Sequence, residues 1–184
     1  MDTGQIIRSI ESSVRRNNRS YSGGRHVIYD LGNGYIAKEF SEGQIDNARN
    51  EVFYSLKLKE IGKQTPVITR PGVLPADTGN ETGYFVVMMD IGDLAKKVRC
   101  LKGADADRAI AAFMKEMHQI FTEGGIKPIL QRSGDGFMFD TKRGMGYWFD
   151  LEHWEPIAPG EVESTEKRLK ELVADDEFFY DYFC

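Results

Sequence analysis

Hydrophobic residues recur at intervals of three and four in several stretches of the chain, the spacing that lines one face of an α-helix. This pattern predicts helices over about residues 3–16, 45–61, 105–122 and 163–173. In the second of these, the apolar face is predicted to hold Ile45, Ala48, Val52 and Leu56. The third is the clearest, and the pair Gly124-Gly125 followed by Pro128 marks its end.

Between these stretches lie shorter runs with the composition of β-strands. The runs RHVIYDL and YIAKEF flank Gly32-Asn33-Gly34, and an Asn-Gly pair between two such runs predicts a β-hairpin. YFVVMMDI (84–91) predicts a strand covered on both faces, VITRPGVL (67–74) a strand leading into a turn, and ADTGNETG (76–83) a loop. A second hairpin is predicted where GFMFD and MGYWFDLE flank TKRG. The chain is therefore expected to be α+β, with a sheet-rich first half and a helix-rich second half.

Composition and charge narrow the class of protein. A chain of 184 residues with 41% hydrophobic and 29% charged residues is expected to form one globular domain. Its net charge of −5 makes nucleic acid an unlikely partner, and the only candidate basic patch is Arg8, Arg15, Arg16 and Arg19, which a solvated helix face also explains. Two cysteines, Cys100 and Cys184, give no disulfide framework, and the sequence has neither a secretory signal pattern nor an apolar run long enough for a membrane span. We expect a cytoplasmic protein, in the cell that makes it or in a host that receives it, with no membrane partner.

Three residues have the types and order that a kinase-type nucleotide site requires. Such a site needs a strand lysine that grips phosphates, a helix carboxylate that holds the lysine, and a metal-binding Asp. Lys38 lies in the predicted strand YIAKEF, Glu51 follows on the next predicted helix, and Asp150 ends the apolar run WFD. An exposed strand lysine and an exposed helix glutamate would explain the first two equally simply.

In this order the residues from about 20 to 155 resemble a minimal, divergent protein kinase. The resemblance includes Gly23-Gly24 as a thin glycine loop, Lys38, Glu51, and the hinge-like segment VVMMDIGDL with Asp90. It implies a two-lobed fold with a β-rich N-lobe over about residues 1–92 and a helical C-lobe over about 93–184. Only about 34 residues follow Asp150, so the C-lobe would be truncated. It also implies ATP and Mg²⁺ as ligands, with Asp150 as the metal ligand and Gly23, Gly24, Arg25, Lys38, Glu51 and Asp90 at the nucleotide.

The sequence departs from the kinase pattern in the catalytic loop. Alignment on FMFD places Gln131 where kinases have the catalytic Asp and Gly136 where they have a metal-binding Asn. Neither side chain can replace the lost one, because a Gln amide is not a base and Gly has no side chain. Asp135 is the substitute catalytic residue that the resemblance leaves, together with Asp150, although a plain turn aspartate between Gly134 and Gly136 explains it as well.

The sequence therefore supports two hypotheses of different class. One is an atypical kinase or pseudokinase of the effector or phage type that binds ATP and acts on, or binds, another protein. The other is a non-enzymatic interaction module that uses the same scaffold, with the aromatic tail EFFYDYFC or the arginine-containing first helix as its binding surface. A third, transfer of AMP in place of phosphate, has no residue that selects it.

Overall fold

The computed structural model describes residues 2–21, 26–79, 81–128, 136–158 and 160–174. Within these ranges the chain forms two compact units, each described here by itself: residues 1–53 with 66–91, and residues 54–65 with 92–184. The secondary structure is mixed α and β, and every paired strand of the sheets is antiparallel, so the α+β prediction is confirmed.

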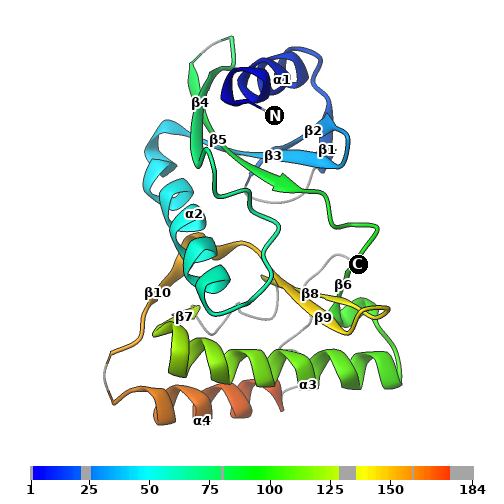
Figure 1. Ribbon diagram of the computed structural model, residues 1–184, viewed down its shortest axis with the longest axis vertical. Helices are drawn as coiled ribbons and strands as arrows, with labels where there is room; N and C mark the ends of the chain where they lie inside the picture. Colours follow the sequence, from blue (N-terminus) through cyan, green and yellow to red (C-terminus); the bar gives the residue numbers. More distant parts are fainter. Residues whose placement is uncertain (1, 22–25, 80, 129–135, 159, 175–184) are drawn as a thin grey trace. The chain divides into compact units, whose positions relative to one another are not determined.

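The first unit is built on a five-stranded antiparallel sheet of order β1-β2-β3-β5-β4 (Figure 1). Its strands are β1 (Arg19–Tyr21), β2 (Ile28–Gly32), β3 (Tyr35–Phe40), β4 (Val73–Asp77) and β5 (Thr82–Met89). The predicted β2–β3 hairpin is confirmed, and Gly32, Asn33 and Gly34 all have positive φ, the conformation that makes this tripeptide suit a tight turn. β5 lies inside the sheet between β3 and β4 and is buried from Phe85 to Met88, as predicted.

Alternation along the strands sends side chains to two separate cores. One face packs against helix α1 (Thr3–Arg15), whose Ile6 and Ile10 join Tyr29, Ala37, Phe85 and other apolar residues. The opposite face holds Phe40, Val67, Val86 and Met88 together with Ala48 of helix α2 (Ile45–Glu60), which follows the short 3₁₀ helix Glu42–Gln44. Odd-numbered residues of β3 thus face α1 and even-numbered ones face α2, which places Lys38 on the α2 side.

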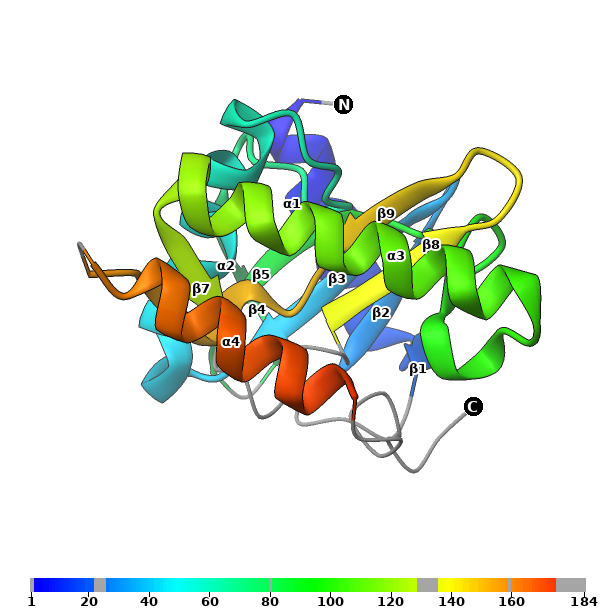
Figure 2. The ribbon, with the colours of Figure 1, turned by 90° about the horizontal axis from the view of Figure 1, so that it is seen from below.

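The second unit contains helices α3 (Ala104–Gln119) and α4 (Val162–Val173) and two small sheets, seen from below in Figure 2. β6 (Lys96–Lys97), β8 (Phe137–Asp140) and β9 (Met145–Trp148) form a three-stranded sheet, and β7 (Ile126–Pro128) pairs with β10 (Trp154–Pro156). α3 continues as a π-helical turn (Ile120–Gly124) and stops at Gly125 in the left-handed conformation. The 3₁₀ turns Val98–Cys100 and Leu151–His153 complete the unit.

A single aromatic core holds this second unit together. Phe113 of α3, Phe137 of β8 and Trp148 of β9 are fully buried, with ring centroids 4.8–5.4 Å apart. The Trp148 indole N–H donates to the Glu116 carboxylate at 2.6 Å, which satisfies its only polar group. This core fixes β9, and β9 leads directly to Asp150.

Some local predictions are wrong. Residues 67–74 were expected to form a strand, but β4 starts only at Val73, after the cis peptide Arg70-Pro71. The expected loop over 76–83 is shorter than predicted, because β4 extends to Asp77 and β5 begins at Thr82. Leu56 was assigned to the buried face of its helix and is 42% exposed, whereas Glu51 and Ser55 are fully buried. Hydrophobic periodicity fails in α2 because its buried positions include polar side chains with polar partners.

Candidate functional site

Lys38 lies at the centre of the sheet of the first unit. In the ladder it stands opposite Ile28 of β2 and Val86 of β5, and both of those residues are apolar. The run of apolar and β-branched residues in the three strands makes this the interior of the sheet. A lysine in such a position has almost no access to water, and its side chain is 3% exposed.

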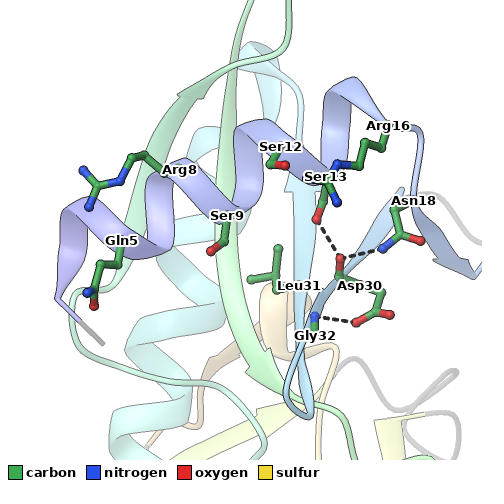
Figure 3. A pocket seen from close by; sticks show the side chains of 10 residues that line it. All are labelled: Gln5, Arg8, Ser9, Ser12, Ser13, Arg16, Asn18, Asp30, Leu31 and Gly32. Carbon is green, nitrogen blue, oxygen red and sulfur yellow. Dashed lines mark hydrogen bonds between the residues drawn. The ribbon is translucent and has the colours of Figure 1, made fainter.

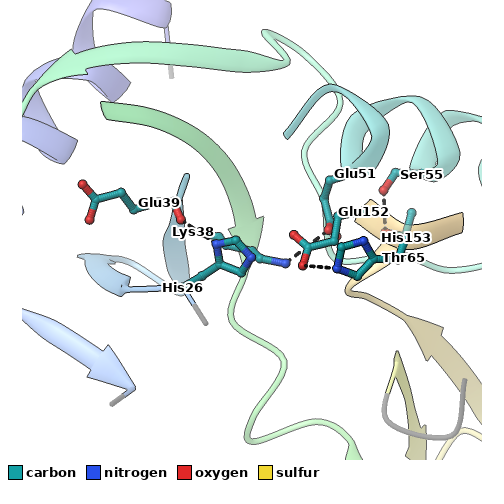
Figure 4. A network of polar contacts seen from close by, with 8 residues as sticks. All are labelled: His26, Lys38, Glu39, Glu51, Ser55, Thr65, Glu152 and His153. Carbon is teal, nitrogen blue, oxygen red and sulfur yellow. Dashed lines mark hydrogen bonds and ion pairs between the residues drawn. The ribbon is translucent and has the colours of Figure 1, made fainter. Parts of the chain in front are cut away.

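The Lys38 ammonium is paired with Glu51 of α2. Nζ donates to Oε2 at 3.3 Å, and the Glu51 side chain has no exposed surface (Figure 4). Transfer of either charge from water into the interior is strongly unfavourable, so the two groups are stable there because each neutralises the other. The pair joins β3 to α2 across 13 residues of sequence.

Aromatic and polar groups on the same sheet face complete the surroundings of the lysine. Nζ lies 5.1 Å from the centroid of the Phe40 ring, within range of a cation–π interaction. The ring of His26 packs on the ring of Phe40, with centroids 4.5 Å apart, and the His26 Nδ1–H donates to the Glu39 carbonyl at 3.0 Å. These contacts give His26 a structural role beside Phe40.

Asp90 also belongs to the first unit. It follows β5 directly, is exposed, and donates its backbone N–H to the Gly34 carbonyl at 2.8 Å. This bond ties the end of β5 to the turn of the β2–β3 hairpin. Of the neighbouring methionines, Met88 is buried in the core and Met89 is 42% exposed.

Asp150 belongs to the second unit and has an unusual backbone. Its φ of 54° and ψ of 46° are left-handed, a conformation that non-glycine residues adopt rarely. The side chain is exposed, and the residue lies between β9 and the 3₁₀ turn that contains Glu152 and His153. Glu152 is buried, and its carboxylate lies 3.4 Å from His153 Nε2. A left-handed non-glycine residue costs free energy and persists only where the surrounding structure holds it in place. Residues of this kind are concentrated at binding and catalytic sites.

Several predicted site residues cannot be placed. Gly23, Gly24, Arg25, Gln131 and Asp135 lie outside the described residues, as does the aromatic tail. Gly136 is described, and a Cβ built on it would lie 2.7 Å from the Phe149 carbonyl oxygen. A side chain therefore cannot be accommodated at this position without a backbone shift, so the position aligned with the kinase Asn is closed to any metal-binding residue.

The part of the chain that the structure describes holds neither a candidate metal cluster nor a helix that could span a membrane. Among the described residues, no three His, Cys, Asp or Glu side chains gather in a way that could hold a metal ion. Within the same ranges, every helix is too short or too polar to cross a bilayer.

Comparison with known proteins gives no family. The sequence matches no protein-family model and no curated protein. Assignment of function therefore depends on the residues of this chain alone.

Sequence reasoning missed one feature of the first unit, an open groove of about 510 Å³ between α1 and strand β2. Its lining is polar and includes side chains that belong to the basic first helix (Figure 3). The alternation of serine and arginine along α1 was the available signal, but nothing in the sequence indicated that β2 would form the opposite wall.

Proposed function

We propose that this chain is an atypical kinase or pseudokinase that binds ATP and Mg²⁺ through Lys38, Glu51 and Asp150. The observation that supports it most directly is the buried ion pair of a strand lysine with a helix glutamate. An ion pair is a poor way to stabilise a core, since apolar residues of similar volume serve as well or better. Its presence at the centre of a sheet is more readily explained by a chemical role for the amine.

The proposal includes a kinase-like fold. Its support is the order of elements in the first unit. A hairpin whose second strand carries Lys38 is followed by the helix with Glu51 and then by two more strands of the same antiparallel sheet. The two-lobed arrangement, with a short helical C-lobe, is part of the same hypothesis and requires Asp150 to meet the Lys38 amine at one ligand.

The residues present suit Mg²⁺ bound together with a nucleotide. Mg²⁺ sites of this kind commonly use one or two carboxylates plus phosphate oxygens and water, so a cluster of three protein ligands is unnecessary. Asp150 offers an exposed carboxylate on a strained residue held by the rigid β9 core. When bound, Mg²⁺ would neutralise phosphate charge, and Lys38 would contribute a second positive group.

The departures in the catalytic loop favour weak or absent phosphate transfer. Gly136 supplies no ligand, and its site is too crowded for one. Lys38 is almost completely enclosed, so phosphate has to displace neighbouring groups to reach the amine. We therefore expect ATP to associate more slowly than a diffusion-controlled ligand would, with a rate constant below about 10⁵ M⁻¹s⁻¹.

Calorimetric titration with ATP, with and without Mg²⁺, tests the proposal. We expect binding to the natural chain, none to the Lys38→Met/Glu51→Met variant, and loss of the Mg²⁺ effect in Asp150→Asn. Lys102→Met and Asp107→Asn are matched controls, since both side chains are exposed and lie outside the proposed site. ATP binding that survives in the double variant would refute the role of Lys38. No binding at millimolar ATP would leave the interaction module as the better hypothesis.

A second variant separates strain from function at Asp150. Glycine adopts the left-handed conformation without a steric penalty, so Asp150→Gly should match or exceed the natural chain in stability, by up to about 1 kcal/mol. The same variant should lose the Mg²⁺ dependence of ATP binding. Chemical denaturation together with the titration checks both parts. A clear loss of stability would show that the Asp150 side chain has a structural role.

A further inference from the structure

The groove between α1 and β2 has a defined arrangement of charge. Four polar residues of α1, at positions 5, 8, 9 and 12, form a stripe on the helix, and Arg16 extends it by one turn. Arg8 and Arg16 lie toward opposite ends of the groove in Figure 3, and eight helical residues separate their Cα atoms by about 12 Å. Between them are short serine side chains, which leave the space open.

The two arginines are available to a ligand. Both are exposed, and among the described residues neither forms an ion pair. Arg15, on the same helix, differs in that it pairs with Glu11 at 3.4 Å and does not line the groove. Two unneutralised guanidinium groups on a chain with a net charge of −5 form a local positive site.

The opposite wall of the groove is preformed. The buried Ser13 hydroxyl donates to the Asp30 carbonyl at 2.7 Å, and the Asn18 side-chain amide donates to the same oxygen at 3.1 Å. The Asp30 carboxylate in turn accepts the Gly32 N–H at 2.7 Å. These bonds fix β2 against α1, so a ligand would not have to order the site, and less of the binding free energy would be lost.

We propose that this groove binds an extended peptide segment with two acidic side chains about four residues apart. Four residues of extended chain span roughly 13 Å, which matches the separation of the arginines. The serine hydroxyls between them can hydrogen-bond to the peptide backbone, and the Asp30 carboxylate can accept a peptide N–H. A volume of about 510 Å³ is in the range of peptide and small-ligand sites.

Other anions fit this arrangement less well. The arginines do not converge on one point, so a single phosphate would engage only one of them. Asp30 lies on the strand wall of the groove (Figure 3), and its negative charge would repel a continuous phosphate backbone or an anionic lipid surface. A peptide places its charges at the ends and neutral groups in the middle. This inference goes beyond nucleotide binding and does not depend on it.

Fluorescence anisotropy with the labelled peptide Gly-Glu-Ser-Gly-Ser-Glu-Gly tests the proposal. We expect a Kd in the range of tens to hundreds of micromolar for the natural chain, with tighter binding at low salt. Arg8→Gln/Arg16→Gln should weaken binding at least about tenfold, a loss consistent with two charge-assisted hydrogen bonds. Arg15→Gln/Arg49→Gln, which changes the net charge equally within the same unit, should leave the affinity within about twofold.

The remaining arms identify the ligand class. A peptide with glutamine in place of both glutamates should not bind, and inorganic phosphate, a single-stranded RNA oligonucleotide and phosphatidylserine vesicles should bind more weakly than the acidic peptide. Equal loss in the two arginine variants, tighter binding of RNA or vesicles, or no peptide binding at millimolar concentration would overturn the proposal. Parallel titrations with ATP separate this result from the nucleotide hypothesis, because the arginine variants should keep their ATP affinity.

Discussion

Removal of either partner of the Lys38–Glu51 pair should be far more destabilising than removal of both. Glu51→Met leaves a buried ammonium and Lys38→Met leaves a buried carboxylate, because both side chains are at most 3% exposed. Loss of one member of a buried pair typically lowers the free energy of unfolding by about 3–5 kcal/mol. The cation–π contact between Lys38 and Phe40 adds about 0.5–2 kcal/mol to the Lys38 variant. Lys38→Met/Glu51→Met has two apolar side chains of similar volume, so it should approach or exceed the natural chain.

The probe must report on the first unit. Both tryptophans, Trp148 and Trp154, belong to the second unit, so their fluorescence follows that unit alone. Hydrogen exchange of the β3 and β5 amides reports directly on the sheet around Lys38. We expect these amides to exchange faster in each single variant, by a factor of about 10²–10³ or more, and to recover protection in the double variant.

The order of stabilities decides the outcome. If the double variant is less stable than both single variants, the two losses add, and the two charges are not coupled as the 3.3 Å contact requires. A single variant with unchanged protection would show that the remaining charge is solvated, in conflict with its burial. Arg49→Met, at the exposed Arg49–Asp46 pair on the same helix and in the same unit, is the control and should change stability by less than about 1 kcal/mol.

Two further predictions concern the second unit. Glu116→Leu deprives the buried Trp148 indole N–H of its acceptor, so we expect a loss of about 1–3 kcal/mol in chemical denaturation followed by tryptophan fluorescence; an unchanged midpoint would contradict this. The second prediction concerns pH: the Lys127 ammonium, 3.0 Å from Glu161, holds the pKa of that carboxyl below its usual 4.5. The pair therefore stabilises the fold above about pH 4.5, and this contribution disappears as the pH falls through the lowered pKa. Thermal unfolding of Lys127→Met should differ from that of the natural chain at pH 6 and converge with it as the pH falls through the lowered pKa of Glu161, and a difference independent of pH would refute the linkage.

The sequence predicted best where one local signal determined the structure. Asn33 between two glycines specified the β2–β3 hairpin, and the apolar spacing in residues 105–122 specified α3, apart from its π-helical end. Short strands such as β6 were missed, because two or three residues carry no periodicity of their own and form a strand only when a partner strand is present.

The candidate site was predicted less completely than the fold. Lys38 and Glu51 could be proposed as a pair from their types and order, but their burial depends on strands β2 and β5, which are distant in sequence. The left-handed backbone of Asp150 has no sequence signature, since Asp tolerates many turn conformations. The groove could not be predicted from the sequence for a similar reason, because one wall is helix α1 and the other is strand β2, which comes from a separate segment.

The strand order of the first sheet has a consequence for synthesis of the chain. β3 and β5 are neighbours in the sheet, although 41 residues lie between Phe40 and Thr82. Until β5 leaves the ribosome, β3 presents an unpaired edge, and Ile36 and Phe40 lack the β5 side chains that pack against them. Formation of the sheet must wait for this long-range closure, which is slow compared with hairpin formation. Aggregation is therefore most favoured while the chain between residues 40 and 89 is being synthesised. A chaperone would have most effect during the same period.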